Sequence, residues 1–447
     1  MTEYDLIIIG AGPGGYVAAE RAGHHGLKVL LIEKEALGGV CLNWGCIPTK
    51  ALLASAKYFY SATHSSEFGV SVQGATFDLT AAMKRKAGIQ EGLRKGIQGL
   101  MKKFKVEVVA GTARVVDAHT VAVGDIQYRA KHLMISTGSS PARPPIPGLD
   151  KPHVLDSNGI LEIKSLPKAL TIIGGGVIGL EFACFFAMVG VPVTVVEMME
   201  EVLPGMDTDI AKLLRAELAS KGVTFHLGCK VQRVDDDAVV FSDPKGAEQR
   251  AVCDMVLVAI GRRPNGAGLG LEEAGVQVER GAIPVDENCR TNVPSIYAVG
   301  DVTGQVLLAH TASRQGEVAV NHILGHPDRM RMHAIPGVVY TSPEVAVVGM
   351  SEAGAKKRGI PVKVGKMPMA ASGRFLAEYS GKGLAKIVVH AETNVLLGVH
   401  IIGGAASEMI HGFTYMIENE TRLNEIKETI FPHPTVSELV RDIAFTL

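Results

Sequence analysis

One supersecondary pattern occurs twice in this chain and restricts its fold more than any other feature. In the first copy, an apolar strand over Tyr4–Gly10 runs into a glycine-rich loop, and a second apolar strand, Leu27–Ile32, ends at the acidic Glu33. The loop fits the pattern G-x-G-x-x-G, whose glycines here are Gly10, Gly12 and Gly15. A strand, a glycine-rich turn, a helix and a second strand are typical of a Rossmann-like βαβ unit.

The second copy repeats the same order later in the chain. An apolar strand over Leu170–Ile173 runs into a second glycine-rich loop, and the strand Val191–Val196 ends at Glu197. The glycines of this loop are Gly174, Gly176 and Gly179. In both copies the acid follows the first glycine by the same number of residues, so the two units are in register with each other.

Each part of the pattern has a physical role. The first glycine permits the tight turn, the second lets the backbone approach a pyrophosphate, and the third lets the helix pack closely on the strand. The start of the helix adds partial positive charge, and the acid accepts hydrogen bonds from ribose hydroxyls. Because all of these parts occur together twice, we expect the chain to bind two dinucleotides.

Composition limits the other partners of the chain. Of its 447 residues, 47% are hydrophobic and 20% are charged, which indicates a globular protein of about two to four domains. The net charge of −1 provides no overall attraction to nucleic acid, and we expect no nucleic-acid partner. Six cysteines are too few for a disulfide scaffold, and the acidic start Met-Thr-Glu-Tyr-Asp-Leu does not resemble a secretory signal. We therefore expect a cytoplasmic protein.

One apolar stretch needs separate consideration. Ala169–Val196 contains Glu181 as its only charged residue and is long enough to cross a bilayer. However, it contains several glycines and a proline, and the second glycine-rich unit lies within it. We expect a buried βαβ unit at this position and no membrane insertion.

Segments rich in proline and glycine suggest the domain borders. Residues 141–148 fit a stiff crossover after the first domain, and residues 261–266 fit the return from the second. From about residue 336, predicted strands at 338–348 and 384–402 and a predicted helix at 405–418 indicate a separate α+β domain. The expected segments are 1–142 for the first dinucleotide-binding domain, 143–266 for the second, 267–335 for the completion of the first, and 336–447 for the C-terminal domain.

Cys41 and Cys46 lie five residues apart, with Trp44, the only tryptophan, between them. A metal site, a pair of inert buried thiols and a redox disulfide are all possible. The nearby side chains of Asn43 and Thr49 are no ligands for zinc, and we expect no metal. Inert burial suits the four isolated cysteines, which are Cys184, Cys229, Cys253 and Cys289.

The position of the pair favours the redox alternative. Cys41 follows closely after Glu33, where the first dinucleotide-binding unit ends. A disulfide at this point of the fold could exchange electrons with a bound flavin. We therefore interpret Cys41 and Cys46 as a redox-active pair.

Several motifs together resemble the pyridine nucleotide–disulfide oxidoreductase family. They are the Cys41–Cys46 hexad with Ile-Pro-Thr-Lys to Lys50, the two glycine-rich loops, Ala298-Val-Gly-Asp301, and His433-Pro-Thr-Val-Ser-Glu438. The resemblance covers essentially the whole chain. It implies an α/β fold with two Rossmann-like dinucleotide-binding domains, one for FAD and one for NAD, and a C-terminal α+β dimerisation domain.

The resemblance assigns FAD to the first unit. Lys50 is implied to lie beside the isoalloxazine ring and to pair with Glu181, and Asp301 is implied to contact the ribityl–phosphate region. The complete set implied to bind FAD is Gly10, Gly12, Gly15, Glu33, Lys50, Gly111, Thr137, Gly138, Asp301 and Ala309.

The resemblance assigns the nicotinamide cofactor to the second unit. A carboxylate at Glu197 favours a free 2′-hydroxyl and repels a 2′-phosphate, and no arginine follows it closely, so NAD is preferred over NADP. The set implied for this cofactor is Gly174, Gly176, Gly179, Glu197, Val231 and Gly261, while Glu181 is implied to act through its pairing with Lys50.

The resemblance also implies the catalytic roles. Cys41 is the interchange thiol that meets the substrate dithiol, and Cys46 lies against the flavin as a thiolate in a charge-transfer pair. His433 is the base that removes a proton from the substrate thiol, and Glu438 orients its imidazole. In this family the histidine reaches the disulfide from the partner subunit, which implies an obligate homodimer.

Within the family, the resemblance is greatest to members that oxidise protein-bound dihydrolipoamide and reduce NAD+ to NADH. The implied partner is the lipoyl domain of a 2-oxo acid dehydrogenase or glycine cleavage complex. The chain lacks a cysteine beyond Cys289, which excludes the C-terminal redox pairs of mercuric reductase and large thioredoxin reductase, and Phe431 stands where such members commonly have a second histidine. An NADH-dependent reductase of another disulfide, a diaphorase and a flavin-binding assembly subunit remain as alternatives.

Overall fold

The chain divides into two compact units in the computed structural model, which describes residues 3–379 and 381–447. Unit 1 comprises Met1–Ala51, Thr80–Ala142 and Gly261–Arg331, and unit 2 comprises Leu52–Leu79, Arg143–Ile260 and Met332–Leu447. Within unit 2, the segments 143–260 and 332–447 build separate sheets. The residue borders of the four expected segments stay predictions.

Unit 1 is built on a seven-stranded sheet in the order β3-β2-β1-β6-β5-β4, with β17 paired to β6. The central strands are parallel, and β4 and β5 form an antiparallel hairpin at one edge. The strands are β1 (Glu3–Ile9), β2 (Val29–Glu33), β3 (Glu107–Ala110), β4 (Ala113–Asp117), β5 (Thr120–Val123), β6 (Ile126–Ile135) and β17 (Ile296–Ala298). A two-stranded sheet of β7 (Ser139–Pro141) and β16 (Arg262–Pro264) accompanies it.

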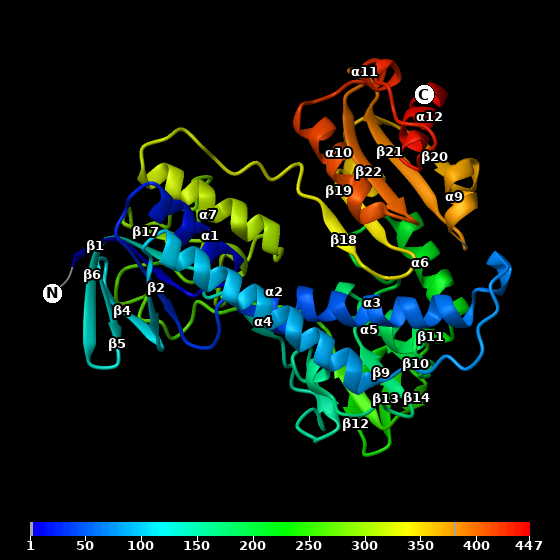
Figure 1. Ribbon diagram of the computed structural model, residues 1–447, viewed down its shortest axis with the longest axis horizontal. Coiled ribbons are helices and arrows are strands. Elements are labelled where there is room, and N and C mark those ends of the chain that lie inside the picture. The colour runs from blue at the N-terminus through cyan, green and yellow to red at the C-terminus, as the bar shows by residue number, and fades with distance from the viewer. Residues whose placement is uncertain (1–2, 380) are drawn as a thin grey trace. The chain divides into compact units, whose positions relative to one another are not determined.

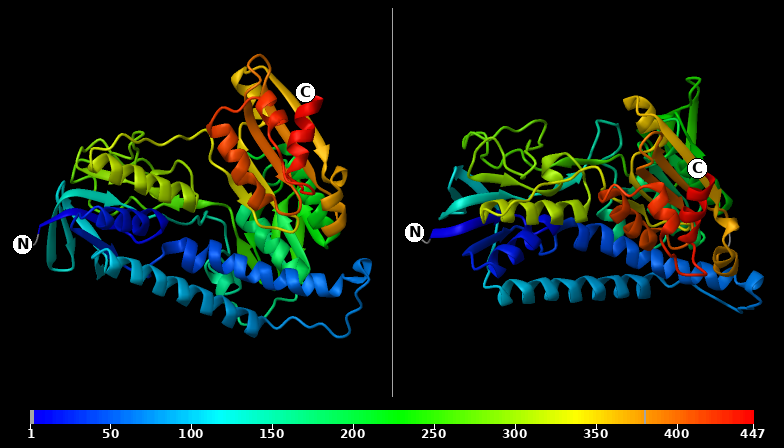
Figure 2. Two further views of the ribbon diagram at one scale, coloured as in Figure 1. Left: turned by 45° about the horizontal axis from the view of Figure 1, so that its top comes forward. Right: turned by 90° about the horizontal axis from the view of Figure 1, so that it is seen from above.

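The apolar run of β1 is explained by burial on both faces. Leu6 and Ile8 face a cluster that includes α1 (Pro13–His24) and α7 (Ala309–Ile323), while Ile7 and Ile9 face the opposite cluster. Helices α1 and α7 lie side by side (Figure 1), and the left view of Figure 2 shows the same pair in dark blue and yellow-green. The Arg21 guanidinium joins them by donating to Asn321 at 2.7 Å.

Three helices follow β2 in the chain. They are α2 (Gly39–Trp44), α3 (Cys46–Thr63) and α4 (Leu79–Lys103). In α4, Ala82, Ile97 and Met101 are buried along one stripe, as the amphipathic spacing of a surface helix requires.

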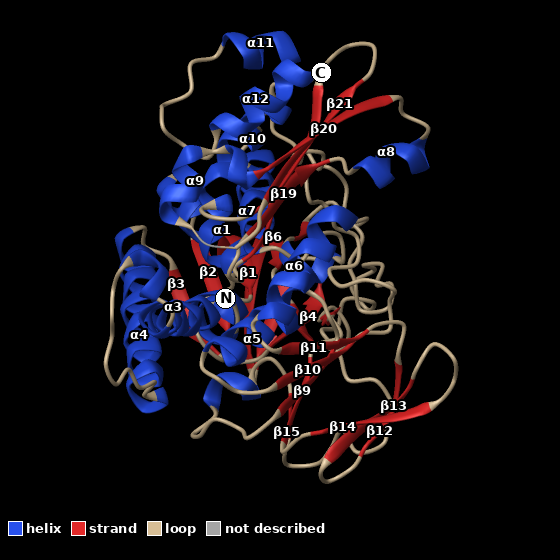
Figure 3. Cartoon of the chain, turned by 90° about the vertical axis from the view of Figure 1, so that its right-hand side faces the viewer, coloured by secondary structure: helices blue, strands red, loops and turns tan. Residues whose placement is uncertain are grey.

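Unit 2 contains the second parallel sheet, in the order β11-β10-β9-β15-β8 (Figure 3). Its strands are β8 (Val154–Leu155), β9 (Leu170–Ile173), β10 (Val193–Val196), β11 (Val223–His226) and β15 (Met255–Val258), and its helices are α5 (Val177–Met188) and α6 (Thr208–Ser220). The same part of the chain also forms a three-stranded antiparallel sheet. Its strands are β12 (Lys230–Val234), β13 (Ala238–Ser242) and β14 (Glu248–Val252).

The C-terminal part of unit 2 is an antiparallel sheet covered by helices, in the order β18-β19-β22-β21-β20. Each of the two regions predicted as strands is a pair of strands, and the predicted helix is α10. The elements are β18 (Gly337–Val339), β19 (Val345–Gly349), α8 (Glu352–Arg358), β20 (Val362–Pro368), α9 (Gly373–Glu378), β21 (Leu384–His390), β22 (Leu396–Ile402), α10 (Ala406–Glu418), α11 (Leu423–Glu428) and α12 (Glu438–Thr446).

Short 3-10 helices occur at four places, namely η1 (Ser66–Phe68), η2 (Gly159–Glu162), η3 (Gly300–Thr303) and η4 (Met369–Ala371). Among the described residues, no helix is both long and apolar enough to cross a bilayer.

Candidate active site

The first glycines of the two loops have the same conformation for the same reason. Gly10 and Gly174 have φ angles of +100° and +108°, in the region that favours glycine. A Cβ on Gly10 would collide with the carbonyl oxygen of Ser136, and a Cβ on Gly174 would lie 2.5 Å from that of Ala259. Each strand therefore turns tightly against its parallel neighbour.

The third glycines bring each helix close to its strand. A Cβ on Gly15 would collide with the carbonyl oxygen of Gly10, and a Cβ on Gly179 would collide with that of Gly174. The start of α1 and the start of α5 are thus fixed against the loops that precede them.

The middle glycines face open space instead. Gly12 and Gly176 are the N-cap residues of α1 and α5. A Cβ on Gly12 would have one neighbour within 4 Å, the Cα of Gly39 at 3.9 Å, and a Cβ on Gly176 would have none among the described atoms. Partly exposed backbone at a helix N-terminus, with room beside it, fits a pyrophosphate at both loops. The two loops therefore suit FAD and NAD as the sequence predicts.

The two acids also occupy equivalent positions. Glu33 accepts hydrogen bonds from the backbone N–H groups of Ala11 and Glu35, both at 2.7 Å. Glu197 accepts from Gly175 at 2.5 Å and from Met199 at 2.7 Å. Each carboxylate lies against its own glycine-rich loop, where it can reach the ribose of a dinucleotide.

The structure brings Cys41 and Cys46 together. Cys41 lies in α2, Cys46 is the first residue of α3, and Gly45 between them has φ −149° and ψ −110°. Both residues are half-buried thiols. A hydrogen bond with Cys46, together with burial, raises the pKa of the Cys41 thiol, while the nearby charge of Lys50 acts in the opposite direction.

The position of Cys46 suits a thiolate. The N-terminus of a helix stabilises negative charge, and α3 is 18 residues long. Lys50 lies one turn further along the same helix and adds positive charge. The four remaining cysteines are buried, as predicted for inert thiols, and they are Cys184, Cys229, Cys253 and Cys289.

A backbone contact joins the cysteine pair to the first glycine-rich loop. The N–H of Gly38 donates to the carbonyl of Ala11 at 2.8 Å. A Cβ on Gly39, whose φ is +57°, would lie 2.5 Å from the Cα of Gly12. The sequence analysis missed Gly39, although the Gly-Gly pair directly before the cysteine hexad is a visible signal.

Asn43, between the two cysteines, connects them to α4 and was also missed as a site residue. Its side-chain amide donates to the carbonyls of Leu37 at 3.0 Å and Gly39 at 2.9 Å. Its own oxygens accept from Arg94 at 3.1 Å and Gln90 at 2.6 Å. No local pattern in the sequence identifies these partners, because they lie about fifty residues away.

Several other predicted FAD residues lie at the ends of strands in unit 1. Gly111 follows β3 with φ +154°, and its N–H donates to the carbonyl of Glu33 at 2.9 Å. Gly138 follows β6 with φ +67°. The carbonyl of Gly138 accepts from the Asn265 N–H at 3.0 Å, and Thr137 makes two further hydrogen bonds with Asn265, at 2.9 and 3.1 Å.

Asp301 and Ala309 lie at helix starts in unit 1. Asp301 is in η3 and accepts from the Ser139 hydroxyl at 2.5 Å. Arg262 donates to the same hydroxyl at 2.7 Å and lies 3.9 Å from the Asp301 carboxylate. Ala309 is the first residue of α7. The contacts of Ser139 and Arg262 with Asp301 were not predictable from the motif that contains Asp301.

The structure also brings His433 and Glu438 together. The Nδ1 atom of His433 lies 3.0 Å from a carboxylate oxygen of Glu438, and the other oxygen accepts from the Thr435 N–H at 2.7 Å. The Thr435 N–H and then His433 hold the pKa of Glu438 below its usual value. The imidazole is 82% exposed, so its free nitrogen is accessible from solvent.

The structure also describes the surroundings of the remaining predicted residues. Glu181, in α5, is buried and accepts from the Tyr340 N–H at 2.9 Å, while its expected pairing with Lys50 stays a prediction. Val231 lies in β12, and Gly261 has φ +116°. Phe431 packs against the C-terminal core.

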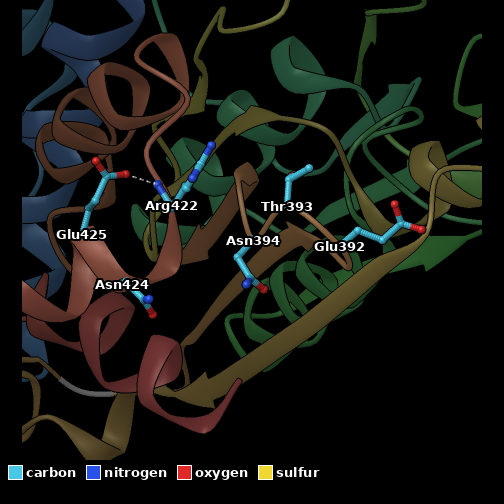
Figure 4. A pocket seen from close by; sticks show the side chains of 6 residues that line it. All are labelled: Glu392, Thr393, Asn394, Arg422, Asn424 and Glu425. Carbon is cyan, nitrogen blue, oxygen red and sulfur yellow. Dashed lines mark hydrogen bonds between the residues drawn. The ribbon is translucent and has the colours of Figure 1, made fainter.

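The structure also has a pocket on the C-terminal sheet (Figure 4). Its lining residues come from the turn between β21 and β22 and from the start of α11, and they are Glu392, Thr393, Asn394, Arg422, Asn424 and Glu425. The backbone N–H of Arg422 donates to Glu425 at 2.7 Å. The predicted site residues are absent from this lining, and we do not regard the pocket as the active site.

Comparison with known proteins agrees with this geometry. Residues 4–316 match the pyridine nucleotide-disulphide oxidoreductase family, and residues 335–444 match its dimerisation domain. The chain is 42% identical to the dihydrolipoyl dehydrogenases of Chlamydia pneumoniae and Geobacillus stearothermophilus, with 98% and 99% of this chain and 95% and 96% of those chains covered.

Solved structures give the same result. The flavoprotein disulfide reductase RclA from Escherichia coli superposes with a TM-score of 0.89 at 31% identity, covering 100% of both chains. LpdA from Mycobacterium tuberculosis superposes with a TM-score of 0.90 at 27% identity, covering 100% of this chain and 99% of that one. Fold, sequence and site geometry agree that this chain belongs to the pyridine nucleotide-disulphide oxidoreductase family.

Proposed function

We propose that this chain oxidises a dihydrolipoyl group carried on a protein and passes two electrons through Cys41 and Cys46 to FAD and then to NAD+. One observation supports this most. The N–H of Gly38, just before the helix that contains Cys41, donates a 2.8 Å hydrogen bond to the carbonyl of Ala11 in the first glycine-rich loop. A dithiol next to a dinucleotide loop is what electron transfer between thiols and a flavin requires. The dihydrolipoyl dehydrogenases at 42% identity support the choice of dithiol.

The proposed thiol chemistry gives each of these side chains one role. His433 takes a proton from one substrate thiol, and the resulting thiolate attacks the Cys41 sulfur of the Cys41–Cys46 disulfide. The disulfide bond breaks, Cys46 leaves as a thiolate, and the start of α3 and Lys50 stabilise its negative charge. The second substrate thiol then displaces Cys41, which gives an oxidised substrate disulfide and a reduced cysteine pair.

Glu438 is placed to orient the base. Its 3.0 Å contact with Nδ1 favours the tautomer in which the other imidazole nitrogen is free to accept a proton. A bound FAD would supply the two-electron chemistry that connects the reduced cysteines with NAD+. The residues proposed to bind it are those of the first loop with Glu33, Lys50, Gly111, Thr137, Gly138, Asp301 and Ala309.

The second loop is proposed to bind NAD through Gly174, Gly176, Gly179 and Glu197, and Val231 and Gly261 are proposed to belong to the same site. Glu181 is proposed to pair with Lys50 beside the flavin. Residues 335–444 match a dimerisation domain, and we propose a homodimer in which His433 serves the cysteine pair of the partner subunit. The proposed protein partner is the lipoyl domain of a 2-oxo acid dehydrogenase or glycine cleavage complex, and the proposed location is the cytoplasm.

A second candidate is the NADH-dependent reduction of another disulfide. The likeness to RclA, a flavoprotein disulfide reductase, favours it. The two candidates use the same cysteines and cofactors and differ in substrate and direction.

The test supplies purified protein with dihydrolipoamide and NAD+ and follows the appearance of NADH. Parallel reactions contain NADP+ in place of NAD+ and glutathione in place of dihydrolipoamide. NADH formation that needs both the lipoyl dithiol and NAD+ supports the proposal. A protein that oxidises NADH with other disulfides and ignores dihydrolipoamide supports the second candidate instead.

A further inference from the structure

A buried lysine in the C-terminal sheet contacts three carboxylates, two of which belong to the nucleotide-binding part of unit 2. Lys386, in β21, has a side chain only 3% exposed. Its ammonium lies 2.9 Å from Asp207, 3.0 Å from Asp209 and 2.7 Å from Glu352. The proposed mechanism gives this residue no role.

The charge of Lys386 is maintained by these contacts. Burial alone would lower the pKa of its ammonium, but hydrogen bonds to Glu352, Asp207 and Asp209 raise it above its ordinary value. Asp207 is equally buried, at 3% exposure, so neither charge of this pair is satisfied by solvent. Removal of the lysine charge would leave the buried Asp207 carboxylate without the ammonium that faces it.

Asp207 is the last residue of a short segment that reaches the second glycine-rich loop. Within this segment, which is Glu201–Asp207, the N–H of Leu203 donates to the carbonyl of Gly175 at 2.9 Å. The N–H of Met206 donates to the carbonyl of Leu203 at 3.0 Å and closes the turn between them. Asp207 then caps α6 by accepting from the Asp209 N–H at 3.0 Å.

The segment also packs against the loop. The Val202 side chain lies 3.1 Å from where a Cβ of Gly175 would be, and Val202 and Leu203 are 1% and 2% exposed. Leu203 has φ +51°, a conformation that L side chains rarely adopt and that persists only where neighbouring contacts impose it. The hydrogen bond of Leu203 to Gly175 and the ion pair of Asp207 with Lys386 hold this conformation from its two sides.

An ion pair fixes the beginning of the same segment. Arg215, on α6, donates to both carboxylate oxygens of Glu201, at 2.8 and 3.0 Å. Since α6 starts at Asp207, its position depends on the same capping residue that Lys386 contacts. The segment is therefore anchored at both ends to α6 and at Leu203 to the loop.

We propose that Lys386 is a positioning residue for the nicotinamide nucleotide, acting from the C-terminal sheet through Asp207 and the segment Glu201–Asp207 on the glycine-rich loop at Gly175. The inference rests on the proposed binding of NAD at the second loop. Lys386 itself does not touch the nucleotide. Its loss lets the segment and the loop move, which weakens NAD binding and leaves the FAD loop and the cysteine pair of unit 1 unchanged.

The test compares Lys386→Met with the unaltered protein in two measurements. Calorimetry gives the Kd for NAD+, and absorbance gives the FAD content. We expect the Kd for NAD+ to rise about tenfold, since small displacements of a binding loop have effects of this order, with unchanged FAD content. In steady state with dihydrolipoamide, KM for NAD+ rises while kcat at saturating NAD+ changes little.

Lys366→Met is the matched control. Lys366 is the cross-strand neighbour of Lys386 and lies 3.6 Å from Asp209, but it is 61% exposed. The same substitution there leaves the Kd for NAD+ within about twofold of the unaltered value, because an exposed ion pair contributes little. Lys386→Arg keeps the positive charge, so its affinity for NAD+ should lie between that of Lys386→Met and that of the unaltered protein.

Asp207→Asn decides the question if Lys386→Met does not fold. Asparagine still caps a helix but removes the charge that faces Lys386, so the Kd for NAD+ is expected to rise in this variant too. An unchanged Kd in a folded variant overturns the proposal, as does a loss of FAD content equal to the loss of NAD+ affinity. Calorimetry does not depend on the dithiol substrate, so failure of dihydrolipoamide oxidation would be seen separately.

Discussion

The imidazole of His433 and the carboxylate of Glu438 are joined by a 3.0 Å hydrogen bond in unit 2. The second oxygen of the same carboxylate accepts the Thr435 N–H at 2.7 Å, so the acid is fixed to the backbone beside His433. With Nδ1 facing the acid, Nε2 does not face it, which is the arrangement that the proposed role of His433 as a base requires.

Glu438→Gln should impair the dithiol reaction specifically. The amide oxygen can still accept from Thr435, but the negative charge opposite Nδ1 is lost. We expect kcat with dihydrolipoamide to fall about a hundredfold, the order of a general base contribution. The rate of NADH oxidation by ferricyanide, which needs no thiol base, should not change.

Glu425→Gln is the control for that substitution, because Glu425 also accepts a backbone N–H, from Arg422 at 2.7 Å, in the same unit. Equal dithiol rates in the Glu438 and Glu425 variants would show that the His433–Glu438 contact has no part in catalysis.

Cys41→Ser should abolish oxidation of dihydrolipoamide. Serine has nearly the same shape but forms no disulfide, so FAD content should be normal and NADH oxidation by ferricyanide should persist. Cys184→Ser is the matched control, since Cys184 is buried and accepts the Ser342 N–H at 3.2 Å, which a hydroxyl also can do. Oxidation of dihydrolipoamide by the Cys41→Ser protein would refute the redox role of Cys41. A role in assembly alone would not be affected by this substitution.

The repeated nucleotide-binding units were predictable because their signals are local. The strand predicted at Leu170–Ile173 has these bounds in the structure as β9. The strand predicted from Leu27 begins at Val29 instead, because the N–H of Leu27 still donates to the Ala22 carbonyl at 3.1 Å at the end of α1. Apolar character alone did not distinguish this helix-terminal turn from the strand.

The contacts between distant segments were not predictable. In the sequence, Asn43 is one polar residue within a motif. Its hydrogen bonds with Gln90 and Arg94 depend on how α4 packs. Lys386 breaks the apolar pattern of a buried strand, and only the fold shows that Asp207 lies opposite it. Hydrogen-bond partners far apart in sequence leave no periodic signal in a single chain.

Glu197→Gln should weaken the preference for NAD+ over NADP+. The carboxylate accepts two backbone N–H groups at 2.5 and 2.7 Å, and the amide oxygen can keep one of them. Loss of the negative charge removes repulsion of a 2′-phosphate, so the ratio of kcat/KM for NADP+ to that for NAD+ should rise about tenfold. Glu200→Gln, a change of an exposed neighbouring carboxylate, should leave this ratio nearly unchanged.

Asp209→Asn should lower Tm at neutral pH, and by less in acid. The hydrogen bond from Lys386 holds the pKa of Asp209 below its ordinary value of 3.8. A carboxylate with a lowered pKa stabilises the folded state above its unfolded pKa and loses this contribution as pH falls through its folded pKa. The difference in Tm between the two proteins should therefore be constant from pH 7 to about 5 and should shrink below about 4.

Asp125→Asn, in an exposed turn of unit 1, is the control for the pH series and should change Tm little at any pH. A Tm difference for Asp209→Asn that stays the same down to pH 3 would mean that its ion pair with Lys386 does not stabilise the fold.

Two alanine substitutions in the second loop should separate binding from folding. Gly176 has an ordinary φ of −78°, and an added Cβ would meet open space, so Gly176→Ala should fold with an unchanged Tm. The methyl group fills the space proposed for the pyrophosphate, and the Kd for NAD+ should rise about tenfold or more. In Gly179→Ala the added Cβ collides with the Gly174 carbonyl oxygen, which should cost about 1–3 kcal/mol of stability. Normal NAD+ binding by a folded Gly176→Ala protein would place the nucleotide elsewhere, because a phosphate at the start of α5 has no room beside that methyl group.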